Sequence, residues 1–207
     1  RFWTLYNFDD KSHITTQGAT RIYKMESNYA THMVTLSLKN NSYLEFIPEQ
    51  IIPYKDSRFY QKTNLDIDDS STAVYSETIV PGRIAMGEMF DFDICYLKTE
   101  GSLNQKIQFR DSSLLMPKSQ KIQSLAMFDD KTILTSVYVL TKKHVTKINN
   151  LINEMFSNIQ GILGGSSILP NDLGVSIRIL GNSSEEQKTT IYQILKIIRK
   201  EILPDYL

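Results

Sequence analysis

Apolar and polar residues alternate along several segments of this chain, with the period of two that is typical of a half-buried β-strand. These segments are residues 31–39, 58–68, 90–97 and 103–110. In the first of them, Val34, Leu36 and Leu38 share one face. The corresponding faces of the other three consist of Phe59, Thr63, Leu65 and Ile67; of Phe90, Phe92, Ile94 and Tyr96; and of Leu103, Ile107 and Phe109. Asn40-Asn41 and residues 68–71 follow two of the segments and have the composition of turns. Many strands joined by short turns predict a mainly β body.

The period changes after Leu140, where apolar residues recur three and four positions apart, as on one face of an α-helix. The first such stripe consists of Val145, Ile148, Ile152, Met155 and Ile159. We expect Thr141 to be the N-cap of this helix. A second helix is predicted to start at a capping box in residues 183–186 and to stop by Pro204, because proline cannot continue a helix.

A glycine-rich stretch, residues 161–167, lies between the two predicted helices. It lacks the lysine that a phosphate-binding Walker loop requires, so we interpret it as a flexible connector. Val175, Ile177 and Ile179 then alternate with polar residues and predict one more strand.

Charge and cysteine content limit the classes of partner. The 207 residues contain 23 Lys and Arg and 23 Asp and Glu, so the formal net charge is zero. A protein that mainly binds nucleic acid usually carries a basic surface, which argues against that partner. No stretch approaches the roughly 18 consecutive apolar residues of a membrane span. The lone Cys95 cannot form an intramolecular disulfide, and this predicts a cytoplasmic location.

The sequence shows no clear catalytic constellation. The histidines are His13, His32 and His144, and none has another histidine or cysteine at a metal-ligand spacing. We interpret His32 as a partly buried structural imidazole. Asp91 and Asp93 would lie on one strand face and could act as an acid–base pair, although a solvated polar face is the ordinary explanation.

Four short motifs follow one another in the first half of the chain. They are Thr-Thr-Gln-Gly-Ala-Thr-Arg-Ile-Tyr at residues 15–23, Leu-Glu-Phe-Ile-Pro-Glu-Gln-Ile-Ile-Pro at 44–53, Ser-Glu-Thr-Ile-Val-Pro-Gly-Arg at 76–83, and Gly87-Glu88. In this order and spacing they resemble the UreD/UreH family of urease accessory proteins. The resemblance assigns family-motif or partner-binding roles to Thr15, Thr16, Gln17, Arg21, Tyr23, Glu45, Pro48, Glu49, Pro53, Gly82, Arg83 and Gly87.

The resemblance implies both a fold and a role. The fold would be one domain over residues 1–207, mainly β, with a solenoid-like (β-helical) stack of strands and two C-terminal helices. It would lack the N-terminal stretch that precedes the Thr-Thr-Gln motif in the family. The implied role is non-catalytic: together with UreF and the GTPase UreG, such a protein docks on apo-urease and assists nickel insertion.

A nickel conduit should hold Ni²⁺ weakly, and carboxylates are weaker hosts than imidazole or thiolate. We therefore expect transient Ni²⁺ and no tightly bound cofactor. Glu77 and Glu88 are the first candidates for stepping points, with Asp91 and Asp93 second. The competing interpretation of Glu77 is a structural ion pair with Arg83.

A different class of function also fits the pattern. A β-solenoid carbohydrate-active enzyme would use Asp91 and Asp93 as its acid and base. Co-purification with urease proteins, as opposed to turnover of a polysaccharide by the chain alone, separates the two hypotheses.

Overall fold

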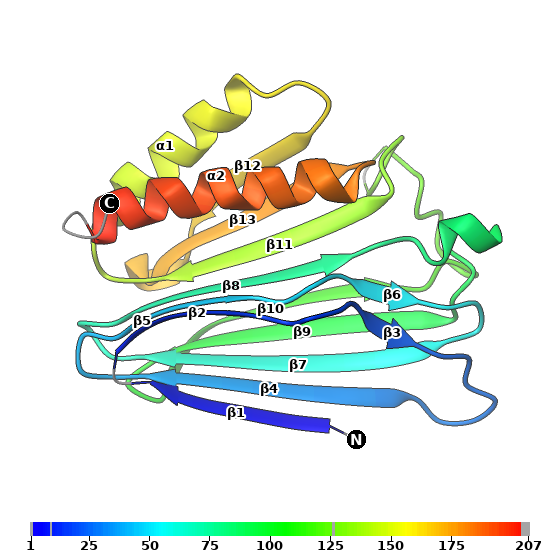
Figure 1. Cartoon of the computed structure of the whole chain (residues 1–207), viewed down its shortest axis with the longest axis horizontal. Coiled ribbons are helices and arrows are strands. Elements are labelled where there is room, and N and C mark those ends of the chain that lie inside the picture. The colour runs from blue at the N-terminus through cyan, green and yellow to red at the C-terminus, as the bar shows by residue number, and fades with distance from the viewer. Residues whose placement is uncertain (1, 9, 126, 204–207) are drawn as a thin grey trace.

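The computed structural model describes residues 2–8, 10–125 and 127–203, which form two β-sheets and a layer of helices (Figure 1). The first sheet contains, in spatial order, β1 (Phe2–Phe8), β4 (Ala30–Leu38), β7 (Arg58–Ile67), β9 (Ile94–Leu103) and β10 (Lys106–Leu115). The second contains β12 (Leu163–Ile168), β13 (Gly174–Gly181), β11 (Ile133–Leu140), β8 (Thr72–Ile79), β5 (Tyr43–Ile47) and β2 (Lys11–Thr15). The short β3 (Thr20–Ile22) and β6 (Ile51–Pro53) pair with each other, and β6 also pairs with β8.

Both sheets mix parallel and antiparallel strands. The chain passes alternately through the two sheets, so that β1, β4, β7 and β9 pair in parallel, as do β2, β5 and β8. β10 then pairs antiparallel with β9, and β11 pairs antiparallel with both β8 and β13. The predicted mainly β body with two C-terminal helices is confirmed. The predicted solenoid-like stack is not, because the antiparallel strands turn both sheets into open mixed sheets.

The second sheet lies between the first sheet and the helices α1 (Val145–Ser157) and α2 (Ser184–Ile202) (Figure 1). One apolar cluster, which includes Val74, Ile152 and Ile194, fills the space between this sheet and the helices. Another, which includes Leu36 and Tyr75, lies between the two sheets. All eight residues of β8 are consequently buried, as expected for a strand covered on both faces.

The alternation pattern located some strands correctly and misplaced others. In β7, Phe59, Leu65 and Ile67 are buried, as predicted. The strand predicted for residues 90–97 begins only at Ile94, because Phe90 has a positive φ of 56° that interrupts an extended chain. Its core face carries Cys95 and Leu97 in place of Ile94 and Tyr96.

In β10 the pairing register shifts between Ile107 and Phe109. Phe109 is therefore buried, while Ile107, which was predicted to share its face, is exposed.

The helix starts show one correct prediction and one error. Ser183 caps α2, and its hydroxyl accepts a hydrogen bond from the backbone N–H of Glu186 at 3.3 Å. The helix ends at Ile202, ahead of Pro204, which lies outside the described residues. Thr141 does not cap α1: the N-cap is His144, with φ 52°. The Thr141 hydroxyl accepts instead from the N–H of Lys143 at 3.1 Å.

The glycine-rich stretch is a strand, not a flexible connector. β12 pairs antiparallel with β13 and forms one end of the second sheet. A Cβ atom on Gly164 would lie 2.1 Å from the ring of Phe156 on α1. The glycine therefore serves close packing of the helix on the sheet, a use that composition alone does not reveal.

Candidate functional site

Glu77 lies in the middle of β8 with its side chain between the two sheets and only 4% exposed. The Tyr75 hydroxyl donates to Glu77 Oε2 at 3.1 Å, and Gln61 Nε2 donates to the same oxygen at 3.3 Å. Burial raises the pKa of Glu77 to about 7, although these hydrogen bonds and the charge of Arg178 oppose the shift. This carboxyl group is thus poised between its neutral and ionised forms near neutral pH.

A chain of hydrogen bonds leads from Glu77 across the interior to the first sheet. Gln61 Nε2 also donates to the Tyr75 hydroxyl at 3.0 Å, and the Thr63 hydroxyl donates to the same oxygen at 3.2 Å. Gln61 Oε1 lies 3.0 Å from Nδ1 of His32 on β4. His32 is partly buried, as predicted, and burial lowers its pKa. Side chains from β4, β7 and β8 therefore form one continuous polar path between the two sheets.

A second polar group, which the sequence analysis missed, lies next to this path. Tyr138 on β11 stacks on Tyr75 with ring centroids 6.2 Å apart, and its hydroxyl donates to Asp111 Oδ2 at 3.1 Å. Arg178 on β13 donates to the same Asp111 oxygen and, at 3.2 Å, to the Tyr138 hydroxyl. The available signal was Arg178, a charged residue that stands between Ile177 and Ile179 in the predicted strand.

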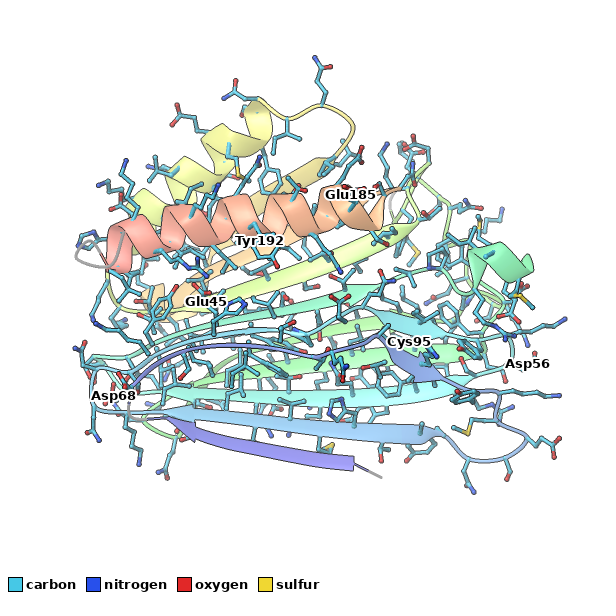
Figure 2. All side chains as sticks on the ribbon, viewed as in Figure 1. Glu45, Asp56, Asp68, Cys95, Glu185 and Tyr192 are labelled. Carbon is cyan, nitrogen blue, oxygen red and sulfur yellow. The ribbon has the colours of Figure 1, made fainter. Side chains whose placement is uncertain are left out.

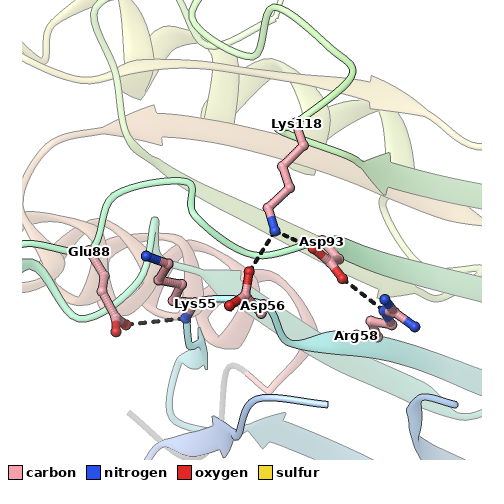
Figure 3. Close-up of polar contacts among 6 residues, drawn as sticks. All are labelled: Lys55, Asp56, Arg58, Glu88, Asp93 and Lys118. Atoms are coloured by element: carbon pink, nitrogen blue, oxygen red, sulfur yellow. Dashed lines mark hydrogen bonds and ion pairs between the residues drawn. The ribbon is translucent and has the colours of Figure 1, made fainter. Parts of the chain in front are cut away.

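The structure does not bring the other three nickel-route candidates to Glu77. Glu88, Asp91 and Asp93 lie in the connection between β8 and β9. Glu88 and Asp93 form ion pairs there, and Figure 3 shows those of Asp93. The Arg83 guanidinium donates to both carboxylate oxygens of Glu88, so the alternative ion pair between Glu77 and Arg83 is not formed. Asp91 Oδ2 accepts only a long bond of 3.2 Å from the N–H of Met89 among the described contacts.

Asp93 is held between two cations. Arg58 Nε lies 2.8 Å from one of its oxygens, and Lys118 Nζ lies 2.5 Å from the other. Lys118 also contacts Asp56 at 2.6 Å (Figure 3). Hydrogen bonds from Lys118 and Arg58 lower the pKa of Asp93, whereas a general acid needs a raised pKa. Asp91 and Asp93 also lie before β9 and not on one strand face, so this geometry does not support an acid–base pair.

The side chain of Thr16 connects two of the sequence motifs. The Thr16 hydroxyl accepts from the N–H of Glu49 at 2.9 Å and donates to the carbonyl of Gly18 at 3.2 Å. Thr15 and the exposed Gln17 flank this contact, and Pro48 precedes Glu49. The motif around residues 15–23 therefore lies directly beside the motif around residues 44–53.

Glu45 fastens α2 to the second sheet. It is buried, and it accepts from Arg199 Nε at 2.7 Å and from the Tyr43 hydroxyl at 2.6 Å, while His13 Nδ1 lies 2.6 Å away. Burial alone would raise its pKa, but these hydrogen bonds outweigh burial and lower it. Figure 2 shows Glu45 beneath the helix. Its position favours a structural role.

The remaining motif residues gather at the β3–β6 end of the molecule. Arg21 and Tyr23 are exposed at β3, and Tyr23 meets Tyr54 edge to face at 5.1 Å. The Arg83 guanidinium lies 4.0 Å from the centre of the Tyr54 ring. Pro53 is buried at the end of β6. Gly82, at φ 141°, and Gly87, at φ 77°, shape the loop that brings Glu88 to Arg83.

The fold and the interior site define a class of protein. It is a two-sheet β protein with helices on one side, whose central carboxylate is embedded in hydrogen bonds. Among the residues that the structure describes, no three His, Cys, Asp or Glu side chains converge on a possible metal position. Neither described α-helix is long and apolar enough to cross a membrane.

Comparisons with known proteins identify the family. The family model for the UreD urease accessory protein matches residues 9–205. Over 206 residues the chain is 36% identical to the urease accessory protein UreD of Cenarchaeum symbiosum, covering 98% of this chain and 72% of that protein. It is 34% identical over 198 residues to UreD 2 of Brucella canis, covering 94% and 66%. The chain belongs to the UreD family of urease accessory proteins, and it spans about two thirds of the length of its Brucella relative.

Proposed function

We propose that this chain is a non-catalytic scaffold of urease maturation in the cytoplasm. Together with UreF and the GTPase UreG it docks on apo-urease and assists the insertion of nickel. The family match over residues 9–205 and the relatives named urease accessory proteins support a role in maturation. Ni²⁺ passes through as cargo, without a tightly bound cofactor and without nucleic acid or membrane as a partner.

The buried carboxyl group of Glu77 is the observation that supports the nickel part of this proposal. It offers oxygen ligands and no thiolate or imidazole, so it attracts a divalent cation without trapping it. Because its pKa is about 7, a proton and a cation compete for the same oxygens near neutral pH. Glu88, Asp91 and Asp93 serve as outer stepping points, and Glu88 and Asp93 bind a cation only when their ion pairs open.

Co-expression with cognate UreF, UreG and urease subunits tests this function. The wild-type chain is expected to capture these proteins, and the recovered urease to contain nickel. Glu77→Gln keeps the shape and removes the charge, so we expect normal assembly with several-fold lower nickel content and activity. Glu88→Gln tests the outer position in the same way.

Glu100→Gln is the matched control. Glu100 is also a mostly buried glutamate, but it bonds Lys62 and Lys98 on the first sheet and lies outside the interior polar path. A wild-type chain that captures none of these proteins would show that the scaffold role is wrong. If the Glu77→Gln variant activates urease as well as the wild type does, Glu77 is not on the nickel route, and the scaffold role is unaffected. A failure of the variant to assemble would assign Glu77 a structural role.

A further inference from the structure

An open groove runs between the first half of α2 and the edge of the second sheet. Its walls include Thr15 on β2, Pro48 and Glu49 after β5, and Gln187 and Tyr192 on α2. Figure 2 shows Tyr192 near the middle of the helix. Residues from two sequence motifs and a helix more than 130 positions further along the chain thus meet in one place.

The walls of the groove are fastened to one another. Lys188 Nζ lies 2.7 Å from Glu49 Oε1, and the Ser184 hydroxyl donates to Gln50 Oε1 at 2.9 Å. The contact between Thr16 and the N–H of Glu49 fixes the opposite wall. A surface that is held in shape before a partner arrives loses less conformational entropy on binding.

Gln187 lines the groove and has one buried side-chain atom that lacks a hydrogen-bond partner among the described residues. The side chain is 1% exposed, and Nε2 donates to the carbonyl of Ile133 at 3.4 Å. This contact assigns the amide orientation, because a carbonyl cannot pair with Oε1. Oε1 has no hydrogen-bond partner in the described part of the chain. Buried polar atoms nearly always have a partner, so this acceptor calls for a donor.

The rim has the composition of a protein interface. Tyr192 is 54% exposed although it stands beside the buried Ile191, which forms part of the floor. Exposed tyrosines next to a buried apolar floor are characteristic of protein–protein contacts. Besides Gln187 Oε1, the half-buried Glu49 carboxylate has a second oxygen, Oε2, in addition to the Oε1 that pairs with Lys188. These acceptors favour a ligand rich in N–H donors.

We propose that this groove docks a loop or tail of a partner protein, which inserts an amide- or guanidinium-bearing side chain towards Gln187. Tyr192 packs against the stem of that side chain, and the Gln187 carboxamide turns to accept from its N–H group. This inference rests on the proposed function, because it assigns one surface to the assembly with the maturation partners.

Binding of purified UreF, UreG and apo-urease to the purified chain, one at a time, tests the groove. Tyr192→Glu places a charge where the stem packs, and Gln187→Leu removes the acceptor at nearly constant volume. We expect both variants to weaken the binding of one and the same partner at least tenfold. Tyr29→Glu is the matched control, since Tyr29 is 61% exposed but does not line the groove.

Two further measurements make the outcome decisive. Thermal unfolding of each variant checks the fold, and Tyr192→Glu decides the question if Gln187→Leu is unstable. Hydrogen exchange on the wild-type chain should slow in residues 184–192 when the partner binds. If a folded Tyr192→Glu variant binds as the wild type does, or if exchange does not slow in the bound state, the groove is not the docking site. The proposed scaffold role is unaffected by either result. A wild-type chain that binds none of the three proteins overturns the scaffold role itself.

Discussion

The side chain of Asn153 on α1 forms two hydrogen bonds with the backbone of Ser166 on β12. Its Nδ2 donates to the Ser166 carbonyl at 3.1 Å, and its Oδ1 accepts from the Ser166 N–H at 2.9 Å. β12 is the last strand of the second sheet, so these backbone groups would otherwise face outward unpaired. One asparagine thus takes the place of a neighbouring strand and protects the edge.

Asn153→Leu should therefore destabilise the protein and promote association. Two backbone groups lose their partners, which costs about 1–3 kcal/mol. We expect a lower urea midpoint and more light scattering on heating. Asn158→Leu is the control, because the Asn158 amide donates to the carbonyl of Glu154 on α1 and bonds no strand among the described residues. Equal scattering by both variants would contradict edge protection.

The adjacent glycines of β12 provide a packing test. A methyl group at Gly164 would overlap the Phe156 ring, whereas at Gly165 the nearest atom is Asn153 Oδ1 at 3.8 Å, an ordinary contact. Gly164→Ala should lower the free energy of unfolding by about 1–3 kcal/mol through overpacking. Gly165→Ala should change it much less, as measured by chemical denaturation. Equal effects would mean that the helix adjusts freely over this strand.

Loss of the Arg199 side chain should strongly destabilise the protein. Arg199→Ala leaves the buried Glu45 without its main charged partner, although Tyr43 and His13 still contact it. Loss of a hydrogen bond to a charged group costs about 1.5–3 kcal/mol. Arg110→Ala, which removes an exposed partner of Glu100, should cost less than about 1 kcal/mol. Urea denaturation at pH 7 compares the two. A similar small effect for both would show that α2 is not anchored by Glu45.

The Glu45 contacts also predict a pH dependence. Because the folded-state pKa of Glu45 is lowered, its contribution is fully present above the unfolded value of 4.5. It is lost as the pH falls below 4.5 through the folded pKa. The wild-type chain should therefore lose stability more steeply below pH 4.5 than Glu45→Gln does. Parallel curves for the two proteins in acid would exclude this linkage.

Glu77 should show the opposite pH dependence. Its pKa is raised to about 7 in the folded protein, so the folded state holds a proton that the unfolded state releases. The resulting destabilisation grows from the unfolded pKa of 4.5 up to pH 7 and is constant above that. Glu77→Gln should thus gain stability relative to wild type between pH 5 and pH 8, by roughly 2–4 kcal/mol. A pH-independent difference would place the carboxyl pKa near its ordinary value.

The sequence predicted those parts of the fold that follow from local periodicity. The alternation in β7 and the capping box at Ser183 are local patterns, and both appear as expected. The positive φ of Phe90 belongs to the connection between β8 and β9, and the register shift after Ile107 belongs to the pairing of β10 with β9. Neither is visible in the alternation, which therefore misplaced the faces that follow them. β12 was missed because its glycine makes room for Phe156, which comes from another element.

The candidate site was only partly predictable for the same reason. Glu77 was selected from its motif, but its burial and its contacts with Tyr75 and Gln61 arise only when β7 and β8 face each other. Glu88 and Asp93 were selected as acids near Glu77 in sequence, and the fold instead gives them cationic partners. Whether any of them carries nickel stays a prediction.

β8 pairs in parallel with β5 on one side and antiparallel with β11 on the other. The parallel strands that precede it and the antiparallel strands that follow it in the second sheet therefore share one strand. Suppose that the chain were divided just before or just after β8 and expressed as two fragments. The fragments would then have to re-form a strand pairing at the centre of the second sheet, either β5 with β8 or β8 with β11. Circular permutation or insertion is better tolerated at turns such as Asn40-Asn41, where the cut leaves every strand pairing intact.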